Sequence, residues 1–174
     1  MRRLRYSVAM SLDGYIADPD GGYDWIVMDP AIDFEAFFAT IDTVLMGRRT
    51  FELTLRQSAG GGMPGMHTYV FTRTLDQADY PEVTIVADHA AETVEQLKAE
   101  AGTDIWLMGG GELFRSLLQT RSVDTVEVGV IPTLLGRGIP LLPPTDQPVR
   151  LALTSHEVFP SGIVLLKYDL QYGA

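Results

Sequence analysis

The sequence contains no cysteine, which excludes a disulfide framework and any metal site built on thiolates. Its three histidines, His67, His89 and His156, lack the spacing of a ligand motif, so we predict no metal centre. No apolar run approaches the length of a membrane-spanning helix, and no signal-peptide core follows the basic start Met1–Arg5. These absences favour a cytoplasmic protein without a membrane partner.

Basic residues are also scarce. The 13 lysines and arginines stand against 23 aspartates and glutamates, which gives a formal net charge of -10, so we expect no nucleic-acid partner. In such an acidic chain a local group of arginines is notable, and Arg48, Arg49 and Arg73 form that group. The 174 residues are enough for one domain with a sizeable core, and no repeat or linker divides 1–174.

Apolar periodicity predicts a sheet with helices between its strands. Strands are expected over 4–10, 43–46, 68–72, 83–87, 105–108, 123–131, 151–159 and 163–170. Helices are expected after Pro30, after Gly47, over 90–101 and after Gly111. In the first part of the chain, strands alternate with helices, which indicates parallel strands joined by crossover helices on both faces of the sheet. The turn Pro160–Gly162 indicates a closing antiparallel hairpin. The sequence therefore predicts an α/β fold with a mixed, mostly parallel eight-stranded sheet.

Three strand ends carry residues suited to a ligand with phosphate groups. Gly47–Thr50 places two arginines at a helix start, where cations oppose the helix dipole unless an anion binds there. Thr72 and Arg73 follow the next strand, and Gly109–Gly111 follows the strand 105–108, where backbone N–H groups are accessible. Ligands of open α/β sheets lie outside the carboxyl ends of strands, so a dinucleotide site is predicted at this edge. The alternative is a structural domain whose glycine turns bind nothing.

Four segments, SVAMSLDGYIADPDG, VLMGRRTFE, VFTRTL and WLMGGGELF, resemble the dihydrofolate reductase superfamily in order and spacing. The closest branch holds the reductase domain of bacterial riboflavin biosynthesis, RibD C-terminal-like, and small stand-alone homologues. The resemblance covers nearly the whole chain. It implies a dihydrofolate reductase-like fold and an NADPH-dependent reductase that transfers a hydride to a small heterocycle, either pterin-like or ribosylaminopyrimidine-like. A homodimer is compatible with it, and a non-catalytic NADPH-binding module or sensor is the alternative.

The resemblance also implies roles for individual residues. Ala9 would bind the nicotinamide carboxamide through its backbone, and Ile16 would border the ring. Arg48 and Arg73 would hold the 2′-phosphate, which favours NADPH over NADH, and the Gly109-Gly110 pair would be joined by a cis peptide bond. The cofactor set implied in this way is Ala9, Ile16, Gly47, Arg48, Arg49, Thr50, Thr72, Arg73, Met108, Gly109, Gly110, Gly111, Glu112, Leu113 and Phe114.

The first helix carries the predicted substrate side. Asp29-Pro30 is its predicted start, with Asp29 as the N-cap, and the phenylalanines of Phe34–Phe38 have the spacing of a core-facing stripe. Folate reductases place a carboxylate in a Pro-x-acid motif here, whereas the nearest acid in this chain, Asp33, is displaced by one position. We predict Asp33 as the catalytic acid because it borders the stripe, where partial burial is expected, and Trp25, Asp33 and Phe37 as substrate-binding residues. This region lacks a basic set for a substrate phosphate.

Two further segments are interpreted from their composition. The glycine-rich segment Ser58–Met66 is predicted to form a loop or lid. The alternating strand Val123–Ile131 and the loop Pro132–Pro144 are candidates for a dimer contact.

Overall fold

The computed structural model describes residues 1–57 and 60–173, so the first two residues of the predicted loop Ser58–Met66 lie outside the described residues. The strands are β1 (Leu4–Ser11), β2 (Tyr15–Ala17), β3 (Ile41–Gly47), β4 (His67–Phe71), β5 (Thr84–Val86), β6 (Asp104–Gly109), β7 (Thr125–Ile131), β8 (Ile139–Pro140), β9 (Arg150–Val158) and β10 (Val164–Gln171). The helices are α1 (Phe34–Phe38), α2 (Arg48–Gln57), α3 (Ala90–Ala99) and α4 (Gly111–Gln119), with a 3-10 turn η1 (Gln77–Asp79). The predicted order of elements is confirmed, apart from the short strands β2 and β8, which the sequence did not indicate.

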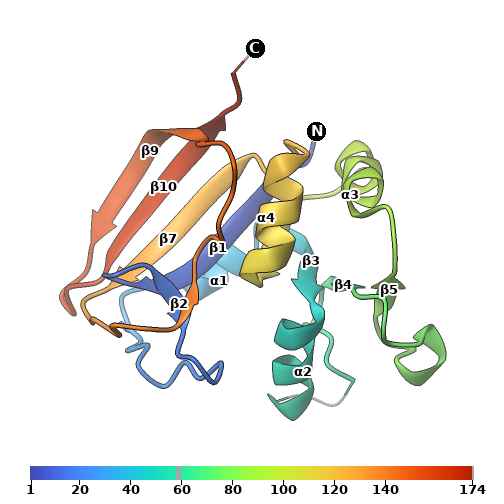
Figure 1. Ribbon diagram of the computed structural model, residues 1–174, viewed down its shortest axis with the longest axis horizontal. Helices are drawn as coiled ribbons and strands as arrows, with labels where there is room; N and C mark the ends of the chain where they lie inside the picture. Colours follow the sequence, from blue (N-terminus) through green and yellow to red (C-terminus); the bar gives the residue numbers. More distant parts are fainter. Residues whose placement is uncertain (58–59, 174) are drawn as a thin grey trace.

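Eight strands form one mixed sheet in the order β5-β4-β3-β6-β1-β7-β10-β9, and β2 pairs with β8 in a separate ribbon (Figure 1). Every pairing from β5 to β7 is parallel, whereas β10 is antiparallel to both β7 and β9. The predicted mostly parallel sheet with a closing hairpin is therefore confirmed. Because the parallel strands point the same way, the carboxyl ends of β4, β3 and β6 lie beside one another at one edge.

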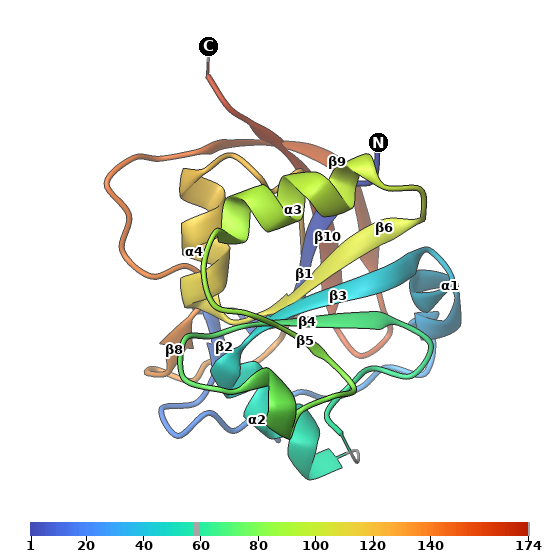
Figure 2. The same ribbon diagram turned by 90° about the vertical axis from the view of Figure 1, so that its right-hand side faces the viewer.

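Helices cover both faces of the sheet, as predicted (Figures 1 and 2). Leu45 belongs to the core that contains Leu117 of α4 and residues of α3, whereas Val44 and Met46 pack with Phe51 of α2 in a second core. Side chains of a strand alternate between the two faces, which is why neighbours on β3 belong to different cores. No helix of the described ranges has the length and apolar character needed to cross a bilayer.

The helix α1 differs from its prediction at its start. Its N-cap is Asp33, whose Oδ1 accepts a hydrogen bond from Ala36 N at 2.8 Å. Asp29, the predicted N-cap, instead accepts from the backbone N–H groups of Ala31 at 2.8 Å and Ser161 at 2.9 Å. The hydrogen bonds from Ser161 and Ala31 lower the pKa of the Asp29 carboxyl. Asp29 therefore ties the segment before α1 to the β9–β10 turn, a contact that local sequence does not reveal.

The predicted core-facing stripe of α1 is wrong as well, because no residue of this helix is buried. Phe37 is half-buried and packs edge-on against Trp106, with ring centroids 5.4 Å apart. Phe34 and Phe38 remain exposed. The helix α1 therefore lies over part of the sheet without burying its own side chains against it.

The strand β7 lies inside the sheet, between β1 and β10. Its Val126 and Val128 are buried in the core under α4, so β7 does not offer the predicted dimer surface. The sheet edge is β9, where Leu151 and Leu153 are exposed. A homodimer remains a prediction.

Candidate functional site

The ends of β3 and β6 bring two glycine turns close together. Met46 of β3 lies opposite Gly109 of β6 in the parallel register. A Cβ at Gly47 would lie 3.8 Å from the backbone nitrogen of Gly110, and one at Gly109 would lie 3.4 Å from the Thr50 hydroxyl oxygen. The two glycine turns, predicted separately at the ends of these two strands, are therefore in contact.

The start of α4 offers hydrogen-bond donors at this edge of the sheet. Gly110 is its N-cap and provides no side-chain cap, and the first N–H groups of a helix have no acceptor within it. Gly109 and Gly110 are joined by a cis peptide bond, as the resemblance implies. Together with the positive end of the helix dipole, these donors suit an anionic group.

Glu112, Leu113 and Phe114 of the predicted cofactor set differ in whether their side chains are accessible to a cofactor. Leu113 and Phe114 are buried, and Phe114 stacks on Tyr6 with ring centroids 3.8 Å apart. A cofactor contact at these two residues would therefore use the backbone. The Glu112 carboxylate pairs with Arg115 at 2.7 Å on the exposed surface of α4.

The predicted arginines all lie at the same edge and are only loosely paired. Arg48 is 3.7 Å from Glu52, and Arg73 is 3.4 Å from Asp88 in a pair whose side chains are mostly exposed. Exposed pairs of this kind are weak, so both guanidinium groups remain available to a phosphate. Arg73 also borders a hollow of about 410 Å³ at the ends of β4 and β5, lined as well by Thr72, Asp88, His89 and the start of α3.

The backbone of Ala9 faces a gap in the sheet. β1 pairs with β6 only as far as Tyr6, whereas its pairing with β7 continues to Ser11. The Arg3 carbonyl accepts from Ile105 N of β6 at 2.9 Å, and the Ser7 carbonyl accepts from the Trp106 indole. By the alternation of a strand, the N–H and C=O of Ala9 point to the same side, where a carboxamide can meet one donor and one acceptor.

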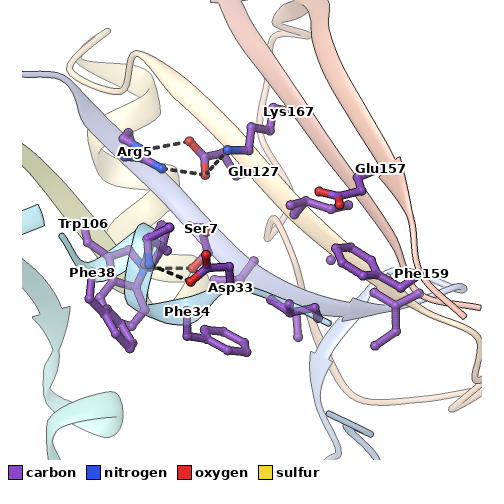
Figure 3. A pocket seen from close by; sticks show the side chains of 18 of the residues that line it. Arg5, Ser7, Asp33, Phe34, Phe38, Trp106, Glu127, Glu157, Phe159 and Lys167 are labelled. Atoms are coloured by element: carbon purple, nitrogen blue, oxygen red, sulfur yellow. Dashed lines mark hydrogen bonds and ion pairs between the residues drawn. The ribbon is translucent and has the colours of Figure 1, made fainter. Parts of the chain in front are cut away.

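A groove of about 650 Å³ opens beside Ala9, between α1 and the sheet (Figure 3). Its floor comes from β1, β7 and β10, and its apolar walls include Phe37, Trp106 and Phe159. Phe114 belongs to the core on the opposite face of the sheet and does not line this groove.

The predicted substrate residues are only partly brought together. Asp33 and Phe37 line the groove, although Asp33 is exposed and so lacks the expected partial burial. Trp25 packs against the cluster that contains Ile131, and its indole donates to the Gly22 carbonyl at 3.3 Å. Ile16 lies in the β2 strand, outside the main sheet.

Sequence reasoning missed the charged residues at the other end of the groove. Arg5 Nε and Nη2 donate to the two Glu127 oxygens at 2.7 and 3.0 Å, and Lys167 Nζ lies 3.9 Å from the same carboxylate (Figure 3). Glu127 is only 5% exposed. The signal was the alternation of Thr125, Glu127 and Gly129 with valines on β7, which marks a strand with a polar face but does not identify its partners.

The comparisons with known proteins agree with this geometry. The chain matches the family model of the RibD C-terminal domain over residues 2–165. It is 33% identical over 178 residues to the uncharacterized protein YyaP of Bacillus subtilis, covering 96% of this chain and 94% of YyaP. It is 30% identical over 147 residues to the riboflavin biosynthesis protein RibD of Mycobacterium tuberculosis, covering 76% of this chain and 43% of RibD. The structure of Enterococcus faecalis dihydrofolate reductase shares the fold, with a TM-score of 0.72 at 21% identity over 98% of this chain and 97% of that one. The chain therefore belongs to the RibD C-terminal domain family.

Proposed function

We propose that this protein is an NADPH-dependent reductase that transfers a hydride to a small heterocyclic substrate, pterin-like or ribosylaminopyrimidine-like. The observation that carries the proposal is that Ala9, whose backbone lies beyond the last pairing of β1 with β6, lines an aromatic groove, while the ends of β3 and β6 in the same sheet carry groups suited to an anion. Family membership supports a reductase, and the Enterococcus faecalis structure was solved with NADP(H). The relative RibD is a riboflavin biosynthesis protein, which favours a substrate of that chemistry.

Each part of the site has a distinct task in this proposal. Bound NADPH supplies the hydride. The N–H groups at Gly110 and the start of α4 would hold the pyrophosphate, and Ala9 would fix the carboxamide and hence the orientation of the ring. Phe37 and Trp106 would stack with the substrate and exclude water. Asp33 would bring the proton that completes the reduction.

The test follows NADPH absorbance with a panel of dihydropterins and of ribosylaminopyrimidines, and the intrinsic fluorescence of Trp25 and Trp106 on titration with NADPH. Turnover of one class supports the proposal. Fluorescence quenching without any turnover would favour the second candidate, a non-catalytic NADPH-binding module or sensor. The observation that favours this candidate is that Asp33 is exposed and acts as the N-cap of α1. Absence of both responses would favour a domain whose turns bind nothing.

We expect Arg73→Ala to weaken NADPH by about tenfold or more and to leave NADH nearly unchanged, because one charge-assisted hydrogen bond to the 2′-phosphate contributes roughly 1.5–3 kcal/mol. Calorimetry with both cofactors measures the difference. Arg56→Ala is the matched control, since it removes the same charge from an exposed position at the far end of α2. Equal losses for NADPH and NADH would contradict the assignment.

We expect Gly110→Ala to lower NADPH affinity while leaving the midpoint of thermal unfolding nearly unchanged. A Cβ there would meet only the Thr50 hydroxyl oxygen at 3.7 Å, an ordinary contact within the protein. It would instead stand where we propose that the cofactor approaches the backbone. Gly111→Ala is the contrasting variant, because its Cβ would lie 3.0 Å from Pro143 Cδ and 3.1 Å from the Pro140 carbonyl oxygen. That variant should lose stability. Full NADPH affinity in Gly110→Ala would indicate a turn with no ligand.

A further inference from the structure

Arg73 lies beside an acidic side chain in the hollow at the ends of β4 and β5. In the parallel register of these strands Phe71 lies opposite Val86, and the Thr72 N–H donates to the Val86 carbonyl at 2.9 Å. Arg73 and Asp88 each stand two residues beyond this matched pair. The backbone therefore places the two side chains next to each other, and their charged groups lie 3.4 Å apart.

The Asp88 carboxylate is available to a ligand. Among the residues that the structure describes, Arg73 is its only ion-pair or hydrogen-bond partner, whereas Glu92, the other acid of the hollow, lies 3.1 Å from His89 Nδ1. The Arg73 side chain is 81% exposed and that of Asp88 64% exposed. Because ion pairs this exposed contribute little, each partner can exchange the other for a ligand at small cost.

The hollow lies within reach of a dinucleotide held at the glycine turns. β4 is next to β3 in the sheet, and β5 is next to β4. Neighbouring strands are about 4.8 Å apart, so the hollow is on the order of 10 Å from the turns of β3 and β6, comparable with the length of a nucleoside. A cofactor with its pyrophosphate at Gly110 would therefore place its adenosine ribose at Arg73 and Asp88.

The two members of this pair favour different groups at the 2′ position of that ribose. NADPH carries a phosphate there, which a guanidinium binds through charge-assisted hydrogen bonds and a carboxylate repels. NADH carries a hydroxyl, for which an acidic side chain is the usual acceptor in dinucleotide sites. A guanidinium has no acceptor atom and gains less from the hydroxyl.

We infer that Asp88 is a specificity-determining residue of the cofactor site and opposes the preference for NADPH that Arg73 confers. Its carboxylate competes with the 2′-phosphate for Arg73 and accepts a hydrogen bond from the free 2′-hydroxyl of NADH. The protein therefore binds both cofactors, and the Arg73–Asp88 pair sets their ratio. This inference rests on the proposed function and extends it to a second cofactor.

The experiment is a calorimetric titration of wild-type protein and Asp88→Ala with NADPH and with NADH. We expect NADPH to bind about three- to fivefold more tightly to the variant, because Arg73 is released from an exposed ion pair. NADH should bind about three- to tenfold more weakly, because one hydrogen bond to the 2′-hydroxyl is lost. Asp79→Ala is the matched control and should change neither affinity, since it removes the same charge from an exposed position that does not line the hollow.

The opposite signs separate this role from others. A structural role of Asp88 would weaken both cofactors, and general repulsion of a dinucleotide would make the variant bind both more tightly, so shifts of the same sign or no shift would overturn the inference. In an Arg73→Ala background, Asp88→Ala should no longer strengthen NADPH binding, and a gain that persists would contradict competition for Arg73.

Binding of neither dinucleotide to the wild-type protein would overturn the proposed function instead. Titration with adenosine 2′-phosphate, which needs only the hollow, would then decide the role of the pair. Tighter binding of this probe to Asp88→Ala than to wild-type protein would retain the competition for Arg73, and equal or absent binding would overturn it.

Discussion

Replacing Arg5 with methionine is expected to destabilise the fold by about 3–5 kcal/mol, because the buried Glu127 carboxylate loses both of its hydrogen bonds to Arg5 and keeps only the Lys167 ammonium, 3.9 Å away. The Arg5 side chain is 10% exposed and the Glu127 side chain 6% exposed, so water cannot replace the lost hydrogen bonds. The guanidinium carbon also lies 5.1 Å from the centre of the Phe37 ring, which adds a contact between the sheet and α1. Urea unfolding monitored by circular dichroism measures the loss.

Two further variants separate the buried charge from the loss of an arginine as such. Arg3→Met removes the partner of Asp169 in a pair with exposed side chains, so it should cost less than about 1 kcal/mol. Arg5→Met combined with Glu127→Leu should recover part of the stability, because both buried charges of the pair are then removed and the charges left, on Lys167 and Asp104, are partly exposed. Similar losses of unfolding free energy in Arg3→Met and Arg5→Met would show that burial of the Arg5–Glu127 pair does not increase its contribution to stability.

The cofactor edge was largely predictable because its signals are local. A glycine turn after an apolar run identifies the end of a buried strand, and parallel alternation then places Gly47 and Gly109 at one edge of the sheet. What the sequence could not give is the distance between them, which depends on the register of β3 and β6. The adjacency of the two turns is therefore a result of the structure.

The substrate side was less predictable because its contacts join distant segments. Arg5 and Glu127 are far apart in the chain and meet only because β1 and β7 are neighbours. The start of α1 was misplaced for the same reason, since Asp29 caps no helix and is used by the turn at Ser161. An Asp-Pro pair favours a helix start locally, but a tertiary hydrogen bond decided otherwise.

Asp33→Asn is expected to reduce turnover by a factor of about 10²–10⁴ on the substrate that the panel identifies, with NADPH affinity unchanged. Asparagine caps a helix as well as aspartate, so the hydrogen bond to Ala36 N and the start of α1 should persist. The variant therefore removes the ionisable group from the groove without removing the cap. Steady-state kinetics and NADPH titration of the same preparations measure both effects.

Two companion variants decide how a loss of turnover is read. Glu35→Gln neutralises a neighbouring exposed carboxylate of α1 that does not line the groove, so it should keep full turnover. Asp33→Ala removes both the carboxylate and the cap, which should cost about 1 kcal/mol of stability as well as turnover. If only Asp33→Ala is impaired, Asp33 positions α1 and does not transfer a proton. Unchanged turnover in Asp33→Asn would exclude Asp33 as the acid, and the proton would then come from Tyr15, Asp24 or bound water.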